Sequence, residues 1–408
     1  MISILWRRND VLACCIFQPV TPQRLRYSDV IAVAISALSV TAVEHLRHQA
    51  KAGFSQTVSG VDLIVGARGG EINLLLYSVF YIGNASRNIS YQSFENLRDT
   101  RDVKWVIPLS MGDSHRGFRV VGTDQNFFEH FRYGQKQPLI FQSGEAFNNA
   151  QSVVIGAAVA KQLNYKTGDQ ITIAHGLGRQ SFQQHDQYPF KVVGILETTG
   201  TPVDQALYVS LAGLEAVHKP GVTPAQAELL KPESITAAMV GLKSRLQTFR
   251  FQRDINQFRA EPLMAILPGV SLSQLWESMN MMENTLRVIS WLILSAALMG
   301  LSATLLASMR ERQKELAVLR TLGARPWFIF ALIQAETLLV TLTAIVIALV
   351  GFGLILSGAQ GLISSRFGIS IDPNFLTPEV IKTLAIIVIA SQLVSLYPGY
   401  KAYRLSLN

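Results

Sequence analysis

The histidines of this chain are the first residues to consider, because histidine can serve as a metal ligand and as a general acid or base. His45 and His48 lie three residues apart in a segment that we expect to be helical, and Glu44 is adjacent to His45. This spacing can bind a metal ion, but two histidines are too few for a site of their own. We therefore predict no metal site and interpret the pair as part of a polar helix surface.

Three further positions could take part in proton transfer. His115 lies in GDSHRG and His185 precedes Asp186 in QQHDQ, and we expect both histidines in solvated loops. Glu336 lies in an apolar segment, where a carboxylate is costly and usually faces other helices. Because the other apolar segments offer only Ser, Thr and Gln as partners, we interpret Glu336 as a structural hydrogen-bonding group rather than as a proton relay.

No catalytic signature is present. HExxH, GxSxG, paired CxxC and the Walker A motif are all missing from the sequence. Cys14 and Cys15 are adjacent, and adjacent cysteines rarely bridge each other, so no disulfide framework is expected. We predict that the chain is not an enzyme and that it binds no cofactor itself.

Apolar segments of membrane length explain why the chain is 49% hydrophobic with a mean hydropathy of +0.27. A helix needs about 20 apolar residues to cross the hydrocarbon core. Three uncharged runs reach about that length, and they are Val288–Met309, Thr337–Ser365 and Thr383–Tyr400. The tail of the second run, SGAQGLISS, is expected to be a loop, so its helix should extend from about Trp327 to Leu356.

A fourth, shorter candidate is Val30–Val43, with only 14 uncharged residues. Basic residues favour the cytoplasmic side of a membrane. They cluster at three places that all become cytoplasmic if four helices cross: Arg7, Arg8, Arg24 and Arg26; Arg310, Arg312, Lys314, Arg320 and Arg325; and Lys401 and Arg404. The formal charge of +8 is therefore a feature of topology rather than a sign of nucleic-acid binding.

These observations predict a membrane protein with four transmembrane α-helices and a large α+β domain inserted between helices 1 and 2. The predicted segments are a cytoplasmic N-terminus (1–28), helix 1 (29–46), the exterior domain (47–285), helix 2 (286–309), a cytoplasmic helix (310–326), helix 3 (327–357), a short exterior loop (358–378), helix 4 (379–400) and a cytoplasmic tail (401–408).

The exterior domain is predicted from short β-like runs separated by Gly, Pro, Asn and Asp. These runs are KWVIPL, FRVVGT, SVVIG, QITIA, FKVVGIL, ALYVSL and ITAAMVGL. GAAVAKQLNY is expected to be a short helix, and another helix should lead from about Leu272 into the second crossing. The domain is long enough for two lobes.

One apolar stretch of this domain, INLLLYSVFYI, is too short to cross a bilayer. It has two interpretations, a buried strand or helix, or an exposed surface for lipid, a lipid-modified client or a partner subunit. The residues of that candidate surface are Leu74, Leu75, Leu76, Tyr77 and Phe80. The neighbouring glycines match no nucleotide-binding motif.

The charged segment between the second and third crossings has the pattern of a short amphipathic helix. No Gly or Pro occurs from Arg310 to Leu322, and leucines recur every three residues. Gly323 can end the helix, and Pro326 precedes the next crossing. Such a helix can lie on lipid, but its glutamates favour docking into a protein groove.

This segment, ERQKELAVLRTLGARPWFIFALIQAETLLV, resembles the signature of FtsX-like permeases, the membrane subunits of ABC transporters of the MacB, LolC/LolE and FtsX type. The resemblance implies a coupling helix that docks on the ATPase, with Lys314, Glu315, Leu319, Arg320, Leu322, Gly323 and Ala324 at the matching positions. Pro398, Lys401 and Ala402 match a second family motif, whereas Gly399 replaces the usual Ala. The exterior segment resembles the MacB-type periplasmic domain in GTDQNFF, VVIGAAVAKQL, KTGDQITI and FKVVGIL.

The resemblance implies the permease subunit of an ATP-driven transporter that works by mechanotransmission in the bacterial inner membrane, with a large periplasmic domain. The client would be hydrophobic or amphipathic: a lipoprotein, a peptide or an antimicrobial. The implied partners are a separate ABC-type ATPase that holds ATP and Mg, a second permease in a homodimer or heterodimer, the lipid bilayer and a periplasmic adaptor or lipoprotein; no nucleic acid is expected.

Two alternatives differ in class from this reading. An FtsX-like regulatory transmitter would activate a periplasmic enzyme without transport, but the large MacB-like exterior domain favours transport, since FtsX itself is smaller outside the membrane. An ion-coupled carrier would require inverted repeats and ionisable pairs at the midplane, and the sequence shows neither.

Overall fold

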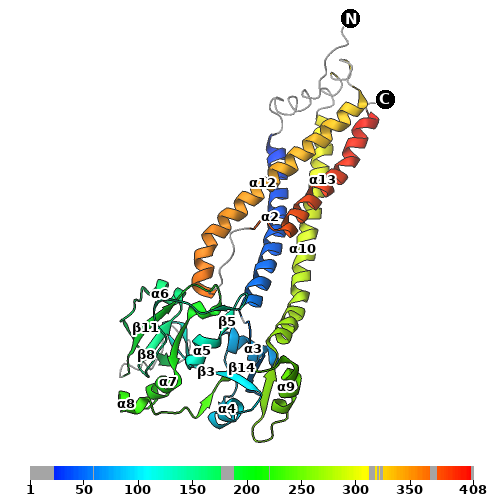
Figure 1. Cartoon of the computed structure of the whole chain (residues 1–408). Coiled ribbons are helices and arrows are strands. Elements are labelled where there is room, and N and C mark those ends of the chain that lie inside the picture. The colour runs from blue at the N-terminus through cyan, green and yellow to red at the C-terminus, as the bar shows by residue number, and fades with distance from the viewer. Residues whose placement is uncertain are drawn as a thin grey trace. The chain divides into compact units, whose positions relative to one another are not determined.

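The computed structural model describes residues 23–57, 59–175, 188–219, 221–311, 318, 321, 325–367 and 375–405. The chain forms two compact units. The membrane unit comprises Met1–Gln49, Asn280–Ala359 and Asp372–Asn408, and the exterior unit comprises Ala50–Met279 and Gln360–Ile371. Figure 1 shows the long helices of the membrane unit and the strands and short helices of the exterior unit.

The membrane unit is built from four helices, each with a segment long and apolar enough to cross a bilayer. They are α2 (Gln23–Gln56), α10 (Pro268–Glu311), α12 (Pro326–Phe367) and α13 (Pro378–Leu405). The corresponding candidate spans are Tyr27–Arg47, Pro268–Glu311, Pro326–Gly358 and Pro378–Lys401. The prediction of four spanning helices, with an α+β domain inserted between the first two, is confirmed.

All four helices are longer than the crossings predicted from the sequence. α2 continues to Gln56 and α13 to Leu405, and α10 begins at Pro268, close to the start expected near Leu272. α12 continues to Phe367, so the prediction that SGAQGLISS forms a loop is wrong. The two glycines of that stretch each cost a helix only about 1 kcal/mol relative to Ala, and without a proline they do not end it.

The core of the bundle combines leucines with small residues. On α10, Leu294, Leu298, Leu301 and Leu305 are buried, with the 4-3-4 spacing of a coiled-coil seam. Small side chains on the neighbouring helices let backbones approach closely, as in other membrane bundles. The buried alanines are Ala34 and Ala37 on α2, and Ala344 and Ala348 on α12.

The exterior unit is organised by an 11-stranded sheet in the order β15-β1-β14-β3-β4-β12-β8-β11-β7, with β10 paired to β3 and β9 to β11. The strands are β1 (Leu63–Ala67), β3 (Val103–His115), β4 (Phe118–Thr123), β7 (Phe141–Gly144), β8 (Ser152–Ile155), β9 (Gln170–Ile171), β10 (Ala174–His175), β11 (Phe190–Leu196), β12 (Ala206–Ser210), β14 (Ala237–Leu242) and β15 (Leu263–Ile266). Most strands predicted from β-branched runs are therefore present, with small shifts at their ends.

Strand β3 joins the two halves of this sheet. Its first part, Val103–Leu109, pairs with β14, and its last part, Ser110–His115, pairs with β4. The pairing with β4 shifts register between Met111 and Ser114, which marks a bulge. The two expected lobes are thus two halves of one sheet that share a strand.

Short helices and small strand pairs cover the sheet. They are α3 (Glu71–Val79), α4 (Tyr91–Arg98), α5 (Gln125–His130), α6 (Ala157–Leu163), α7 (Leu211–Val217), α8 (Pro224–Ala227) and α9 (Thr248–Asn256), with β2 (Ile89–Ser90) paired to β13 (Ser234–Ile235) and β5 (Arg132–Tyr133) paired to β6 (Gln137–Pro138). The core contains a stacked aromatic group in which Phe127 lies 4.6 Å from Tyr208 and 5.0 Å from Phe131 between ring centroids.

A close contact in this core generates a test of the fold. A Cβ atom at Gly241 would overlap the indole of Trp105 on the neighbouring strand, and that indole is stacked on His130 with ring centroids 5.4 Å apart. Gly241→Ala should therefore lower the free energy of unfolding by about 1–3 kcal/mol through overpacking. Thermal unfolding of the purified chain, followed by circular dichroism, would measure it.

Gly112→Ala is the matched control, because nothing lies within 4 Å of a Cβ at that position of the same sheet. Equal melting temperatures for the two variants would contradict the proposed contact.

Candidate functional site

The predicted coupling residues, Lys314, Glu315, Leu319, Arg320, Leu322, Gly323 and Ala324, lie outside the described residues. Within this segment Val318 and Thr321 are helical, and the Thr321 hydroxyl donates to the Val318 carbonyl at 2.8 Å. The side chain of Val318 is exposed. The docking role of this segment stays a prediction.

The helix that follows the segment packs closely on the last helix. The Ser395 hydroxyl of α13 donates to Gln334 Oε1 of α12 at 2.8 Å. At Gly399 a Cβ atom would lie 2.9 Å from the ring of Phe330, and Phe330 in turn stacks on Trp327 with centroids 5.0 Å apart. Glycine at 399, the departure noted in the sequence, is thus explained by the size of Phe330.

A cluster of four charged side chains joins α2 to α10, and we call it the ionic cluster. Arg47 Nε lies 2.8 Å from Glu283 Oε2, and Arg47 Nη1 lies 3.2 Å from Glu44 Oε1. Arg287 Nη2 of α10 lies 3.8 Å from the other oxygen of Glu44. Sequence reasoning missed this cluster, although Glu44–Arg47 and Glu283–Arg287 have the spacing of neighbours on one helix face.

The ionic cluster lies where the uncharged runs of α2 and α10 end: Glu44 directly follows Val43, and Arg287 directly precedes Val288. Toward the other end of the same helices, the Thr304 hydroxyl donates to Asp29 Oδ2 at 2.6 Å. The two helices therefore have polar links on both sides of the apolar seam formed by the α10 leucines.

His45 does not form part of a polar helix surface, so that prediction is wrong for this residue. Its side chain is fully buried, and its ring meets that of Phe352 edge-on at 5.5 Å. The side chain of Phe352 also contacts Phe375 edge-on at 5.4 Å. The described residues contain no group of three or more His, Cys, Asp or Glu side chains that could hold a metal ion.

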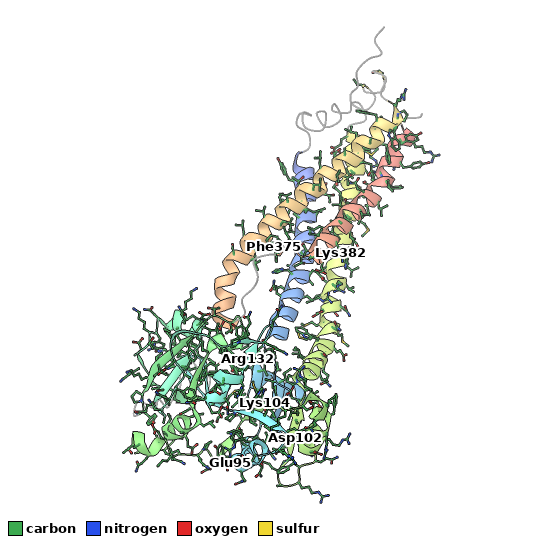
Figure 2. All side chains as sticks on the ribbon, viewed as in Figure 1. Glu95, Asp102, Lys104, Arg132, Phe375 and Lys382 are labelled. Carbon is green, nitrogen blue, oxygen red and sulfur yellow. The ribbon has the colours of Figure 1, made fainter. Side chains whose placement is uncertain are left out.

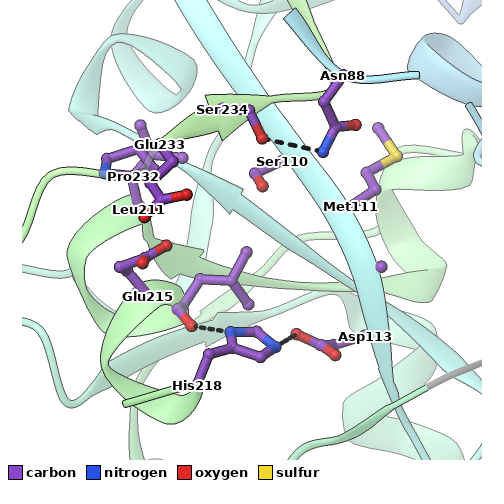
Figure 3. Close-up of a pocket in the computed structure, with 12 residues that line it drawn as sticks. Asn88, Ser110, Met111, Asp113, Leu211, Glu215, His218, Pro232, Glu233 and Ser234 are labelled. Atoms are coloured by element: carbon purple, nitrogen blue, oxygen red, sulfur yellow. Dashed lines mark hydrogen bonds and ion pairs between the residues drawn. The ribbon is translucent and has the colours of Figure 1, made fainter. Parts of the chain in front are cut away.

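The exterior unit contains a polar cavity of about 300 Å³ beside the β3 bulge (Figure 3). Its lining comes from β3, from α7 and the residue after it, from the start of β13 with the two residues before it, and from the residue before β2. The lining residues are Asn88, Ser110, Met111, Gly112, Asp113, Leu211, Leu214, Glu215, His218, Pro232, Glu233 and Ser234. The cavity thus combines three carboxylates with one histidine.

The histidine is oriented by two neighbours. His218 Nε2 lies 3.4 Å from Oδ2 of the buried Asp113, and His218 Nδ1 lies 2.8 Å from the Leu214 carbonyl (Figure 3). The bond to the Asp113 carboxylate is the main cause that raises the pKa of His218 above its usual value. At the rim, Glu215 pairs with Lys219 at 3.0 Å.

His115 also departs from expectation. It is buried at the end of β3, with Nε2 2.9 Å from the Tyr165 hydroxyl and Nδ1 2.5 Å from the Thr172 carbonyl. Burial lowers the pKa of His115. The expected solvated loop is only the two-residue turn Arg116–Gly117, both at positive φ. His185 and Asp186 lie outside the described residues.

The apolar stretch INLLLYSVFYI is a core helix rather than a surface. Leu74, Leu75, Tyr77 and Phe80 are buried in α3 and just after it, and Leu76 packs against the same core. The candidate client or partner surface made of these five side chains is therefore not exposed. Packing against the sheet hides the helix, and the sequence alone cannot show which faces are covered.

Two known families cover most of the chain. The family of the MacB-like periplasmic core domain matches residues 30–258, more than half of the sequence. The chain belongs to the MacB/FtsX-type permeases. Residues 287–407 match the C-terminal domain of FtsX-like permeases. The first match begins within α2 and ends in the exterior unit, and the second begins within α10 and continues through α12 and α13.

Individual relatives of this permease are distant. It is 25% identical over 193 residues to the lipoprotein-releasing system transmembrane protein LolE of Haemophilus influenzae, which is 46% of this chain and 43% of that protein. The match thus spans less than half of the relative's length.

Two solved structures are also similar. The first is the periplasmic region of MacB from Actinobacillus actinomycetemcomitans. The match covers 54% of this chain and 94% of that structure, at 12% identity and a TM-score of 0.35. The second is the extracellular domain of the noncanonic ABC-type transporter YknZ from Gram-positive bacteria. The match covers 50% of this chain and 99% of that structure, at 13% identity and a TM-score of 0.30.

The family assignment confirms the resemblance found in the sequence. The chain is an ABC transporter permease subunit of the non-catalytic type, with spanning helices and a MacB-like periplasmic-type domain.

The ionic cluster predicts a measurable coupling between α2 and α10. In a double-mutant cycle, Arg47→Ala and Glu283→Ala should show a coupling free energy of about 1 kcal/mol, because Glu283 is only 16% exposed. Thermal unfolding in detergent measures the three variants. The control is the exposed pair Arg250–Asp254, with 3.9 Å between the charged atoms, whose coupling free energy should be close to zero. Equal coupling free energies for the two pairs would argue against a stabilising role of the ionic cluster.

The partly exposed His218 and the buried His115 predict opposite pH dependences. A raised pKa at His218 adds stability below about pH 6.5 that is lost as the pH rises through the folded pKa. A lowered pKa at His115 has the opposite effect: the neutral, buried imidazole is compatible with the folded state, and stability is lost as the pH falls and the unfolded chain takes up the proton more readily. His218→Gln should therefore cost more at about pH 5.5 than at about pH 8, by up to about 1 kcal/mol, and His115→Gln should show the reverse order.

Melting temperatures of both variants at the two pH values test this. If the loss in melting temperature caused by each substitution changed with pH in the same direction for both histidines, the opposite pKa shifts of His218 and His115 would be contradicted.

Proposed function

We propose that this permease is the membrane subunit of an ATP-driven transporter that works by mechanotransmission in the bacterial inner membrane. In this mechanism the exterior domain faces the periplasm. ATP binding on a partner moves the cytoplasmic segment, and the helices carry that movement outward. The client is then expelled or extracted by the exterior domain rather than carried between the helices.

The observation that carries this proposal is the continuity of α10. Only Leu267 separates the helix from β15, an edge strand of the sheet, and the helix continues without interruption to Glu311. At 1.5 Å per residue its 44 residues are about 66 Å long, roughly twice the hydrocarbon core of a bilayer. Residues of this one helix belong to both compact units.

An ATPase partner is proposed to dock on the segment between α10 and α12. Its contacts would be Glu315, Arg320 and Gly323, with the remaining residues of the coupling motif around them. ATP and Mg would bind only to that partner, and a second permease, identical or different, would complete the complex.

The proposed client is hydrophobic or amphipathic, such as a lipoprotein, a peptide or an antimicrobial. The similarity to a lipoprotein-releasing protein supports the first of these classes. A periplasmic adaptor or lipoprotein is the corresponding partner outside the membrane.

The docking proposal is tested by reversing one charge. Glu315→Arg should weaken co-purification of the ATPase by about tenfold, equivalent to about 1.4 kcal/mol, because it replaces an anionic contact with a cationic one. The measurement is the amount of ATPase retained by tagged permease in mild detergent, together with its hydrolysis rate.

Glu277→Arg makes the same charge change at an exposed position of α10 in the exterior unit and should retain the ATPase. Equal retention by both variants, with unchanged melting, would reject the coupling assignment. A complex that hydrolyses ATP but releases no lipoprotein, peptide or antimicrobial from reconstituted vesicles would instead favour the regulatory transmitter.

A further inference from the structure

A cleft in the membrane unit has the composition of a headgroup site. It encloses about 300 Å³ and is lined by three helices: Val40, Val43 and Glu44 of α2, Arg287, Ser290 and Trp291 of α10, and Glu379, Lys382 and Thr383 of α13. Valine side chains and the indole supply apolar walls, while four charged groups, two of each sign, surround the opening. We propose that this cleft binds the headgroup of a zwitterionic phospholipid, through its phosphate and its ammonium group.

The position of the cleft along the helices fits a headgroup. Glu44 is near the end of the first span, and Glu379 and Lys382 are near the beginning of the last. Arg287 immediately precedes the uncharged run of α10, and Trp291 lies one turn further along. Basic residues and tryptophans concentrate where hydrocarbon meets water, so these positions correspond to the level of lipid phosphates.

The cations of the cleft differ in how they are paired. Arg287 shares Glu44 with Arg47 and is 3.8 Å from it. Lys382, labelled on α13 in Figure 2, makes no hydrogen bond or ion pair with the side chain of any described residue. Its ammonium group is therefore available to a phosphate, with Arg287 as a second donor across the cleft.

The acids explain why a zwitterion fits better than an anion. The side chain of Glu379 lies one turn before Lys382 and has no ion-pair partner among the described residues. A phosphate bound to Lys382 alone would leave this carboxylate facing an anionic ligand. An ethanolamine headgroup carries an ammonium two carbons from its phosphate ester, so it can satisfy Glu379 and Lys382 together.

The proposed site is linked to the ionic cluster through Arg287. A phosphate that attracts this guanidinium competes with Glu44, and Glu44 also contacts Arg47, another member of the ionic cluster. Occupancy by lipid should therefore loosen one contact between two helices that both reach into the exterior domain. The inference does not depend on the ATPase or on the client.

The test measures lipid retention by the full chain. Purified protein in detergent is incubated with phosphatidylethanolamine, phosphatidylglycerol, diacylglycerol or inorganic phosphate, and bound molecules are counted by native mass spectrometry. Phosphatidylethanolamine should bind at least about threefold more tightly than phosphatidylglycerol. Diacylglycerol, which lacks the phosphate, and free phosphate, which lacks the acyl chains, should both bind weakly.

Lys382→Ala is the decisive variant, because an unpaired exposed side chain can be removed without disturbing the bundle. It should weaken phosphatidylethanolamine binding about tenfold, and Glu379→Gln should remove the preference over phosphatidylglycerol. Lys401→Ala, at the opposite end of α13, is the matched control and should bind as the wild type does. Equal affinity for diacylglycerol, or equal binding by the Lys382→Ala and Lys401→Ala variants, would overturn the site.

Discussion

The hydrocarbon core of the membrane imposes the constraint on which this structure depends. Backbone groups there must be hydrogen-bonded within their own segment, so the chain crosses only as helices. The charges then collect at the ends of the uncharged runs, where Glu44, Arg47, Glu283 and Arg287 form the ionic cluster. The seam between those ends is left to leucines and alanines, which hold the helices by shape alone.

The exterior unit solves the opposite problem, since water surrounds it and burial stabilises it. Its long strand β3 carries both halves of the sheet, and the bulge in that strand places Asp113 where His218 can meet it. A polar cavity therefore arises at the point where regular pairing is interrupted. The same strand, β3, thus holds the two halves of the sheet together and supplies polar residues to the cavity.

Patterns that depend on local chemistry were predictable from the sequence. Runs such as FKVVGIL became strands with little change, and the span lengths identified the helices. Features that depend on which side chains from other segments pack against a residue were not predictable. His45 is polar yet buried against Phe352, and His115 is buried although turn residues surround it in sequence. The apolar run at Leu74 left a surface possible, because most of the core residues that cover it lie far along the chain.

The contact between Gly399 and Phe330 has a consequence for how related sequences should be compared. A methyl group at 399 fits only if the side chain at 330 becomes smaller or turns away, because the gap is 2.9 Å. The two positions are thus expected to change together, and an alanine at one should accompany a less bulky residue at the other. Covariation of this pair would record the spacing of α12 and α13, independently of any structure.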